Sequence, residues 1–532
     1  MNAVKKSTTW AILCRIGGLV SACLLVSLCR DLVLRIPDLV RDSRLYRALA
    51  AEEGALQRFF RRFGALVKES NLFRLLTEEG PWQRLWKSSL TCAFLGWLLN
   101  RIPRALTPKT PSPAGESASL LGRGLDALAP RRHILAGGLF LLMLCVPYEL
   151  WNNLYGAAGA AAIFLAYYLW DIPRRRARPI EARELSPMHI LFLLGALAAF
   201  VFSAHPGLSL RFLIFHFACA LIAFTVLGSV ETVKQLRTML YLVLTGLLAA
   251  CVYGCWQIVH GVEFYSYQLD MSLNEGITGR IYSFFSNPNN FHTFITMLLP
   301  FALGLFISEK STRGRVFCVL VLAFGLAASF ATYSRSGWIG LILALMVLVT
   351  LTDWRYLLLL LVLGILALPF LPSTILTRIT TIGNMKDSST RYRLQIYNSF
   401  SLLLKRCWPT GVGLGTDATY AALHELPPME DGNFALHSHN NYMQLCAEMG
   451  IVGVTAYTLA LLGRVKNAFA AAALASGELR PLAAAAAGSM LGIMVMGLVD
   501  YTWYYPRSMF VFWFLYGVMT VCHRLARVES GE

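Results

Sequence analysis

Two histidines and two asparagines stand close together in the string His437-Ser438-His439-Asn440-Asn441. An imidazole exchanges protons near neutral pH, so a histidine at this place could act as a general base or hold an anionic group. A long apolar run follows directly, and the first amides of a helix that begins there would point toward an anion. Asn440 is of the residue type that caps such a helix. We therefore take His439 as the first candidate for catalysis, with His437 and Asn440 as candidates for substrate binding.

A metal ion is the other chemistry that two histidines suggest. Zinc sites combine Cys and His residues at characteristic spacings, and no cysteine or second histidine pair stands at such a spacing from His437 and His439. We therefore expect neither a metal ion nor another cofactor.

A lone arginine occurs in the string Tyr333-Ser334-Arg335-Ser336-Gly337, between two charge-free runs with almost no loop. A guanidinium at the edge of the hydrocarbon needs an anion, a lipid headgroup or carbonyl groups as its partner. Snorkelling toward lipid phosphate is one interpretation of Arg335. The other is a binding site for a diphosphate, which a guanidinium holds through paired, charge-assisted hydrogen bonds.

A second arginine, Arg280, stands shortly before the string Asn287-Pro288-Asn289-Asn290. Asparagine and proline are typical of turns and helix caps, and we expect Asn290 to cap a helix that begins at Phe291. Arg280, Asn287 and Asn289 are candidate site residues, and an ordinary capped loop is the alternative interpretation.

A third segment carries Arg391 and Arg393 at the start of a predicted short amphipathic helix, with three residues that could rest on the membrane: Leu394, Tyr397 and Leu402. A solvated basic face is the alternative to a functional one. The string Gly411-Val412-Gly413-Leu414-Gly415 lacks the Gly-Lys-Ser/Thr ending of a nucleotide P-loop, so we attribute its glycines to turns.

Four residues near or inside the last predicted spans have two interpretations each. Glu448 and Asp500 are acids at membrane depth, which are either functional or paired with arginine. Gly450 and Gly453 lie on one predicted helical face and favour close packing between helices.

The composition indicates which elements hold these segments. The chain has 532 residues, of which 56% are hydrophobic and 14% charged, and its mean hydropathy is +0.55. Such values exclude a soluble globular protein. In so apolar a chain the net charge of +17 belongs to loops on the cytoplasmic side, so we expect no nucleic-acid binding. Because backbone groups in hydrocarbon must be bonded internally, the sequence predicts an all-α polytopic integral membrane protein.

About 12 transmembrane helices are predicted, since a span needs about 20 apolar residues. The runs without any charge are Thr238–Val259, Val316–Ser334, Gly337–Thr352, Tyr356–Pro372 and Pro481–Val499. The less uniform runs are Ile134–Trp151, Asn152–Trp170, Met188–Ala204, Phe212–Val230, Phe291–Ser308, Tyr442–Leu462 and Ser508–Cys522.

Lysine and arginine occur in every second connection between these runs, beginning at Arg174 and ending at Arg527. Basic connections resist translocation, so we expect them in the cytoplasm. The two longest remaining connections, residues 261–290 and 373–440, are then the outer loops. The candidate residues at 280–289, 391–393 and 437–440 all belong to that outer side.

Residues 1–132 form a basic N-terminal extension with 21 Lys and Arg against 10 Asp and Glu, a surplus of +11. Its run Trp10–Cys29 reads as an uncleaved anchor. Ser88–Leu99 is either a second span, or too short to cross while Leu32–Leu85 lies along a membrane surface. Pro103–Pro130 reads as a flexible linker to the polytopic domain of residues 133–532.

The spacing of His439, Asn440, Gly450 and Gly453 resembles the signature of the O-antigen ligase family. That signature has His, then Asn, Ser or Gln, nine residues, Gly, two residues, and Gly, Thr or Tyr. Segments around Arg280, Arg335 and Arg393 resemble the family too, and the resemblance covers about residues 134–523. Tyr397 stands where members often have Trp, and the N-terminal extension has no counterpart.

The resemblance implies a GT-C-like glycosyltransferase in the bacterial inner membrane, with its active site facing the periplasm or the cell exterior. It would move a glycan from undecaprenyl diphosphate to a lipid or glycan acceptor, without a nucleotide sugar, cofactor or metal. Arg335, Arg280 and either Arg391 or Arg393 would stabilise the diphosphate. His439 would activate the acceptor hydroxyl or help to bind the diphosphate, and Asn440 would orient it.

Two other functions fit parts of this pattern. A polymerase of the same family would use a similar donor to extend a polysaccharide, and the histidine signature favours the ligase. A flippase or transporter of polysaccharide lipids would have inverted repeats and broken, charged helices. The charge-free spans favour the enzyme.

Overall fold

The computed structural model describes residues 62, 65–66, 69–108, 119–262, 279–353, 355–367, 369, 371–380 and 388–531. Every regular element within these residues is a helix. The predicted anchor Trp10–Cys29 lies outside them. The described helices of the N-terminal extension are α5 (Asn71–Thr77), α6 (Pro81–Ser88), α7 (Leu90–Leu99), α8 (Arg101–Ala105) and α9 (Leu120–Leu128).

The remaining helices carry the polytopic domain. The first half contains α10 (Arg132–Cys145), α11 (Asn153–Leu165), α12 (Pro187–Val201), α13 (Pro206–Ser229), α14 (Val233–His260), α15 (Pro288–Ser308) and α16 (Thr312–Ala331). The second half contains α17 (Arg335–Asp353), α18 (Arg355–Ala367), α19 (Ser373–Thr380), α20 (Ser388–Cys407), α21 (Gly415–Leu423), α22 (Asn441–Leu474), α23 (Leu479–Met496) and α24 (Pro506–Ser530).

Nine helices of the described residues are long and apolar enough to cross a membrane: α9 joined to α10, α13, α14, α15, α16, α17, α22, α23 and α24. The other predicted spans coincide with the shorter helices α11, α12 and α18. A π-helical segment, η3 (Ala166–Asp171), extends α11. The prediction of an all-α polytopic membrane protein is confirmed.

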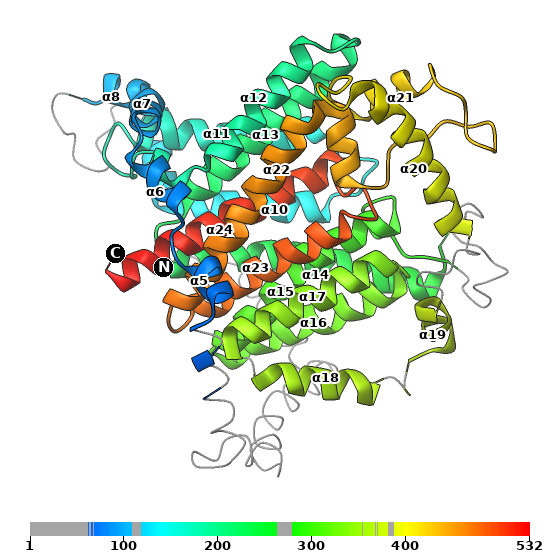
Figure 1. Cartoon of the computed structure of the whole chain (residues 1–532). Helices are drawn as coiled ribbons and strands as arrows, with labels where there is room; N and C mark the ends of the chain where they lie inside the picture. The colour runs from blue at the N-terminus through cyan, green and yellow to red at the C-terminus, as the bar shows by residue number, and fades with distance from the viewer. Residues whose placement is uncertain are drawn as a thin grey trace.

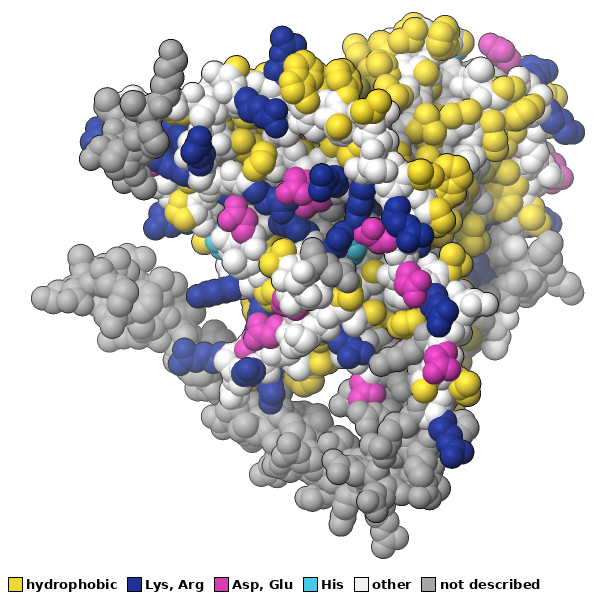
Figure 2. All heavy atoms as spheres, turned by 60° about the vertical axis from the view of Figure 1, so that its left-hand side comes forward, with side chains coloured by type: hydrophobic (Ala, Val, Ile, Leu, Met, Phe, Trp, Pro, Cys, Tyr) yellow, Lys and Arg dark blue, Asp and Glu magenta, His cyan; other side chains and the backbone are white. Residues whose placement is uncertain are grey.

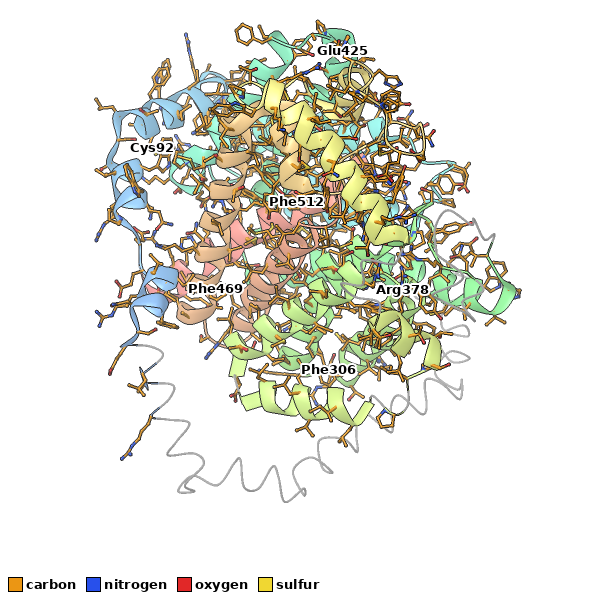
Figure 3. All side chains as sticks on the ribbon, turned by 45° about the vertical axis from the view of Figure 1, so that its right-hand side comes forward. Cys92, Phe306, Arg378, Glu425, Phe469 and Phe512 are labelled. Carbon is orange, nitrogen blue, oxygen red and sulfur yellow. The ribbon has the colours of Figure 1, made fainter. Side chains whose placement is uncertain are left out.

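The spanning helices lie side by side, with α5 to α8 at one end of the bundle and α19 to α21 at the other (Figure 1). We name the first the basic end, because the predicted basic connections meet there. Arg237 pairs with Glu309 and with Glu478, both at 2.6 Å, which joins three connections far apart in sequence. Figure 2 looks toward this end and shows cationic and acidic side chains mixed across the middle of the face. We name the other end the loop end. In Figure 3, Arg378 lies at the loop end, and Cys92 of α7 lies on the opposite side of the bundle.

Small residues bring α17 and α23 into close contact. A Cβ atom added to Gly488 would lie 2.3 Å from the Ala344 carbonyl oxygen, and one added to Gly492 would lie 2.4 Å from that of Gly340. Such spacing lets two helix backbones approach closely in a membrane. The contact fixes the start of α17, which carries Arg335, against the helix that leads to Asp500.

The long connection between α18 and α22 has its own small apolar core. Ile396, Phe400 and Leu403 of α20 pack against Leu423 of α21 and Ala447 of α22. The predicted amphipathic helix is therefore confirmed, but it has 20 residues rather than a few turns, and its apolar face rests on protein. Leu394 and Leu402 remain exposed on its other side.

Glycines shape the backbone beside this core. Gly411, Gly413 and Gly415 all have positive φ, which confirms that turns explain their run. Gly450 also has a positive φ of +68° and marks a kink in α22, so the expected use of this glycine for helix packing is wrong. Gly453 does face another glycine, because its Cα atom lies 3.7 Å from a Cβ atom placed on Gly195.

Two predicted boundaries differ from the structure. Helix α15 begins at Pro288 and its cap is Asn287, not Asn290, since Asn287 Oδ1 accepts the amides of Asn289 and Asn290. Proline favours the first helical position because its missing amide needs no partner there. The predicted linker Pro103–Pro130 contains α9, which Ser119 caps and which continues into α10.

Candidate active site

A cavity of about 1310 Å³ opens at the loop end. Its walls come from the segment before α15, the start of α17, helices α19 and α20, the segment before α22, and the connection between α23 and α24. Eight of the nine predicted site residues line it: Arg280, Asn287, Asn289, Arg335, Arg391, Arg393, His437 and His439. Asn440 does not, because its Oδ1 caps α22 and its Nδ2 donates to the Leu498 carbonyl.

Five arginines line this one cavity: Arg280, Arg335, Arg378, Arg391 and Arg393. Burial, and then the positive charges of Arg378 and Arg393, lower the pKa of Arg280 to about 9, which leaves it charged at neutral pH. Mutual repulsion of this kind is relieved when an anion binds among the guanidinium groups.

Arg280 is held rigidly from behind. Its Nε donates to the Thr332 carbonyl and its terminal nitrogen donates to Asn289 Oδ1, both at 2.8 Å. The irregular backbone around it is satisfied by Gln257, whose side-chain oxygen accepts the amide of Ser283 at 2.8 Å. Irregular backbone at membrane depth is stable only when its polar groups are bonded in this way.

Arg335 and Arg378 belong to two different helices that meet at Tyr333. Arg335 is the first residue of α17, and Arg378 of α19 is only 3% exposed. The Arg378 Nε donates to the Tyr333 carbonyl at 3.4 Å. Tyr333 has a positive φ of 50°, so the backbone turns sharply between α16 and α17. The turn aims both guanidinium groups toward the same cavity.

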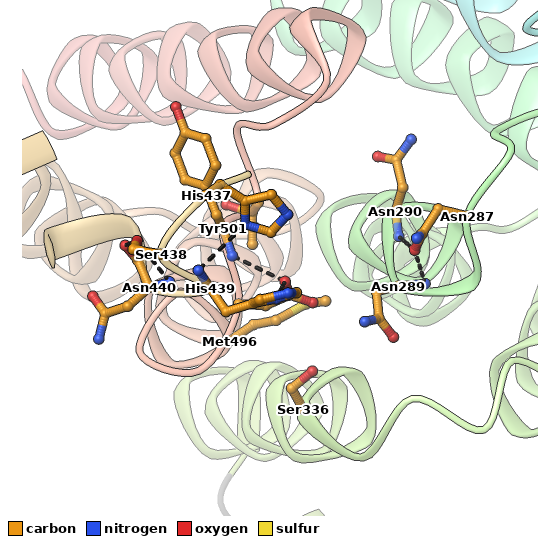
Figure 4. Close-up of polar contacts among 12 residues, drawn as sticks. Asn287, Asn289, Asn290, Ser336, His437, Ser438, His439, Asn440, Met496 and Tyr501 are labelled. Atoms are coloured by element: carbon orange, nitrogen blue, oxygen red, sulfur yellow. Dashed lines mark hydrogen bonds and ion pairs between the residues drawn. The ribbon is translucent and has the colours of Figure 1, made fainter. Parts of the chain in front are cut away.

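His439 faces the arginines from the other side of the cavity. Its Nδ1 lies 3.2 Å from Asp500 Oδ1, which leaves Nε2 as the ring nitrogen available to a substrate. Figure 4 shows the two histidines and Tyr501 on one side of the site, with Asn287, Asn289 and Asn290 facing them across it. A carboxylate behind an imidazole fixes its tautomer and stabilises its protonated form.

Asp500 is buried at 6% exposure beside this histidine. Burial alone would raise its pKa, but the hydrogen bond to His439 and the charges of His439 and Arg393 outweigh burial and lower the pKa to about 2. Asn441 holds the connection that carries Asp500, because its side chain exchanges hydrogen bonds with the hydroxyl and the amide of Thr502.

The backbone of His439 is held in a left-handed conformation, with a φ of 49°. Its amide donates to His437 Nδ1 at 3.2 Å, and its carbonyl accepts the Tyr397 hydroxyl at 3.2 Å. Burial and the charge of His439 lower the pKa of His437 to about 3. His437 is therefore neutral at physiological pH, where it serves as an acceptor within the turn.

A buried chain of polar groups lies behind the histidine turn. The amide of Ser438 donates to Gln444 Oε1 at 2.9 Å, and Gln444 Nε2 donates to Glu448 Oε1 at 3.0 Å. Tyr501 donates to the same Glu448 oxygen at 3.3 Å, and its amide donates to Asp500. Glu448 thus connects both halves of the His439–Asp500 pair. It is bonded to amide and hydroxyl groups rather than to arginine.

Sequence reasoning missed Arg378 and the pairing of His439 with Asp500. Arg378 follows the charge-free run Tyr356–Pro372 but carries no distinguishing neighbour, and the pairing joins positions 61 residues apart. The one available signal was that Arg378, His439 and Asp500 all lie near predicted span ends on the outer side.

The arrangement combines two chemical capabilities. Guanidinium groups on one wall can bind two adjacent phosphates and stabilise negative charge that develops on a leaving group. An imidazole with an ionised partner on the opposite wall can remove a proton from a hydroxyl. Transfer of a group from a diphosphate to a hydroxyl requires both.

Comparison with known families bears on the same segments. The sequence model of a family described as O-Antigen ligase matches residues 319–458, which include Arg335, Arg378, Arg393 and His439. Among curated proteins, no sequence matches the chain significantly. Over this segment the chain is similar to the O-antigen ligase family, which supports a membrane enzyme in surface-polysaccharide assembly.

Proposed function

We propose that the protein is a metal-independent glycosyltransferase that moves a glycan from undecaprenyl diphosphate to a lipid or glycan acceptor. The observation that carries this proposal is the single cavity between the five arginines and the His439–Asp500 pair. We further propose that the loop end faces the periplasm or the cell exterior, since the basic connections lie at the other end. The histidine signature favours a ligase over a polymerase.

The arginine wall would hold the donor's diphosphate. Arg280 and Arg378 are almost fully buried, so little water screens their charges. Arg391 of α20 is exposed at the rim of the cavity, where it would meet an incoming phosphate first. As the bond between sugar and phosphate breaks, the diphosphate gains negative charge, and the fixed guanidinium groups stabilise it.

The opposite wall would prepare the acceptor. His439 Nε2 takes the proton of the acceptor hydroxyl while the oxygen of that hydroxyl forms a bond to the sugar carbon. Asp500 then stabilises the imidazolium, and His439 later returns the proton to solvent or to the diphosphate. An alternative within the same proposal is that His439 only binds the diphosphate.

The decisive experiment supplies the purified protein, in proteoliposomes, with a lipid-linked glycan and separate candidate acceptors. We expect sugar transfer to one acceptor, and greatly reduced transfer by the His439→Ala or Arg335→Ala variant at equal abundance. Extension of the lipid-linked glycan itself would identify a polymerase. Wild-type transfer by either variant would remove that residue from the mechanism.

A His439→Arg variant separates the two roles of the histidine. Arginine can bind a diphosphate but stays protonated and cannot act as a base at neutral pH. Recovered transfer in this variant would favour diphosphate binding, whereas intact donor binding without transfer would favour general-base catalysis.

A further inference from the structure

Helices α6 to α8 form a strap at the basic end, which we define as residues 81–105. The α7 part, Leu90–Leu99, has ten residues and is about 15 Å long, half of a bilayer's hydrocarbon thickness. It therefore cannot cross the membrane by itself. In Figure 1 the strap runs along one end of the bundle and across the direction of the spanning helices.

One side of the strap is attached to the bundle by specific hydrogen bonds. The side chain of Asn100 bonds both backbone groups of Ile180, at 2.8 Å and 3.1 Å. Gln83 donates to Asn467 of α22 at 2.9 Å. Just before the strap, Glu79 pairs with Arg527 of α24 at 2.9 Å. The strap is thus fixed to three separate parts of the basic end.

The other side of the strap is apolar and uncovered. Leu90 is 89% exposed, Phe94 57% and Trp97 45%, and these residues follow one face of α7. Trp82 and Leu85 of α6 are also apolar and exposed, at 82% and 59%. A contiguous apolar stripe of this kind marks a contact with lipid or with another protein.

The depth and charge of the strap favour lipid. The Tyr168 hydroxyl donates to the Leu99 carbonyl, so α7 lies beside the last turns that extend α11 rather than beyond them. Arg101 stacks over Trp97 at 5.2 Å and Arg174 over Trp170 at 3.3 Å. Tryptophan, tyrosine and arginine at this level are typical of the interface between hydrocarbon and headgroups.

We propose that the strap lies in the headgroup region of the leaflet at the basic end. Its apolar stripe enters the acyl boundary, and Arg84, Arg101 and Arg104 contact anionic phosphates. The surplus of +11 in residues 1–132 adds to this attraction. The strap thereby anchors the N-terminal extension to the membrane surface independently of the transfer reaction.

The test measures depth in the full-length protein. A fluorescent amino acid replaces Phe94, Phe217 or Glu425 singly, in liposomes of phosphatidylethanolamine and phosphatidylglycerol that carry nitroxide quenchers near the headgroup or at the bilayer centre. Phe217 is an exposed residue in the middle of α13, and Glu425 is exposed at the loop end. All three side chains are exposed, so the substitutions leave the packing intact.

We expect the probe at position 94 to be quenched most by the shallow nitroxide, at 217 by the deep one, and at 425 by neither. Deep quenching at position 94 would mean that the segment crosses the membrane. An absence of quenching would mean that water or protein covers it. Either result overturns the proposal. In liposomes that contain phosphatidylglycerol, an Arg101→Gln, Arg104→Gln variant should show less shallow quenching at position 94 than the unsubstituted protein. In liposomes without phosphatidylglycerol, the two proteins should be quenched equally. Unchanged quenching would overturn the role of anionic headgroups.

Discussion

At the scale of single residues, the site depends on a histidine whose two ring nitrogens have different tasks. Nδ1 of His439 faces Asp500, and only Nε2 can meet a substrate. The carboxylate keeps its charge at every physiological pH, because its pKa is about 2. The charged carboxylate can stabilise an imidazolium on His439 after that ring takes a proton from a hydroxyl.

Asp500→Asn removes this charge while it keeps the shape of the side chain. A hydrogen bond to a charged group contributes about 1.5–3 kcal/mol, so we expect transfer to fall about 10- to 150-fold. His439→Ala should cost more, about 10²- to 10⁴-fold, because the base itself is lost. Both are measured as kcat in the proteoliposome assay. An Asp500→Asn variant with unchanged kcat would contradict the role of the pair.

Tyr397→Phe tests how the turn at His439 is held. The variant loses only the hydrogen bond to the His439 carbonyl, a net contribution of about 0.5–1.5 kcal/mol. We expect kcat to fall about 2- to 13-fold with little change in KM. Tyr420→Phe removes a hydroxyl from the neighbouring helix α21, outside the residues that line the cavity, and serves as the control. A change confined to KM would place Tyr397 in substrate binding instead.

Residue types alone predicted most of the site residues, but they did not predict which of these residues lie next to one another. Arg335 and Arg280 stood out because charge is rare at the edge of apolar runs. Their shared cavity with Arg378 depends on how α15, α17 and α19 pack. No local pattern records that packing. The same holds for Glu448, whose partners come from its own helix and from the connection after α23.

At the scale of elements, the kink of α22 links the histidine signature to the fold. Gly450 has a φ of +68°, and a Cβ atom there would lie 2.2 Å from the Pro409 carbonyl oxygen. The amide that follows, of Ile451, donates to the Trp408 carbonyl at 2.8 Å. The first glycine of the signature, Gly450, therefore contacts the connection between α20 and α21.

Gly450→Ala should destabilise the protein, because alanine has both left-handed strain of about 1–2 kcal/mol and a backbone clash at this position. Gly463→Ala in the same helix is the matched control, since a Cβ atom there meets nothing within 4 Å. The control should be neutral or more stable by about 0.4–1 kcal/mol. Thermal unfolding in detergent compares the two. Equal melting temperatures would contradict the assigned strain.

Hydrophobicity predicted the spans well and their ends less well. Each of the twelve runs predicted between residues 134 and 522 contains a helix, because backbone groups in hydrocarbon must be bonded internally. The start of α15 was misplaced because Asn287 and Asn290 are equally good caps in sequence, and only Pro288 decides between them. Helix α20 was predicted too short because its apolar face packs on α21 and α22, which the sequence does not reveal.

At the scale of the whole molecule, charge is divided between the two ends in different ways. The basic end pairs its cations with acids, as in the contacts of Arg237 with Glu309 and Glu478. The loop end gathers five arginines around one cavity, which Glu430, Asp431 and Asp500 also line. Because guanidinium groups can stabilise the negative charge of an anionic substrate there, we expect no divalent ion to be needed.

Treatment with EDTA therefore should leave transfer unchanged. In the proposed mechanism, the arginines would stabilise the developing charge that a divalent ion otherwise stabilises. The measurement compares initial rates of sugar transfer with and without the chelator, and a known metal-dependent glycosyltransferase serves as the positive control. A rate that falls with EDTA and recovers with Mg²⁺ or Mn²⁺ would refute the metal-independent mechanism and leave the arginine site to be explained otherwise.

The alternation of basic and non-basic connections also predicts which way the whole molecule faces, and this can be measured without any substrate. Glu425→Cys lies at the loop end and Thr312→Cys at the basic end, and both original side chains are exposed. An impermeant maleimide is added to cells whose outer envelope is permeabilised and whose inner membrane is intact. It should label position 425 and spare position 312, because basic connections stay in the cytoplasm. Inverted membrane vesicles should give the opposite pattern, and unsubstituted protein reports the labelling of native cysteines. Labelling of position 312 in intact cells would place the arginine cavity in the cytoplasm, where the proposed transfer to an outer acceptor cannot occur.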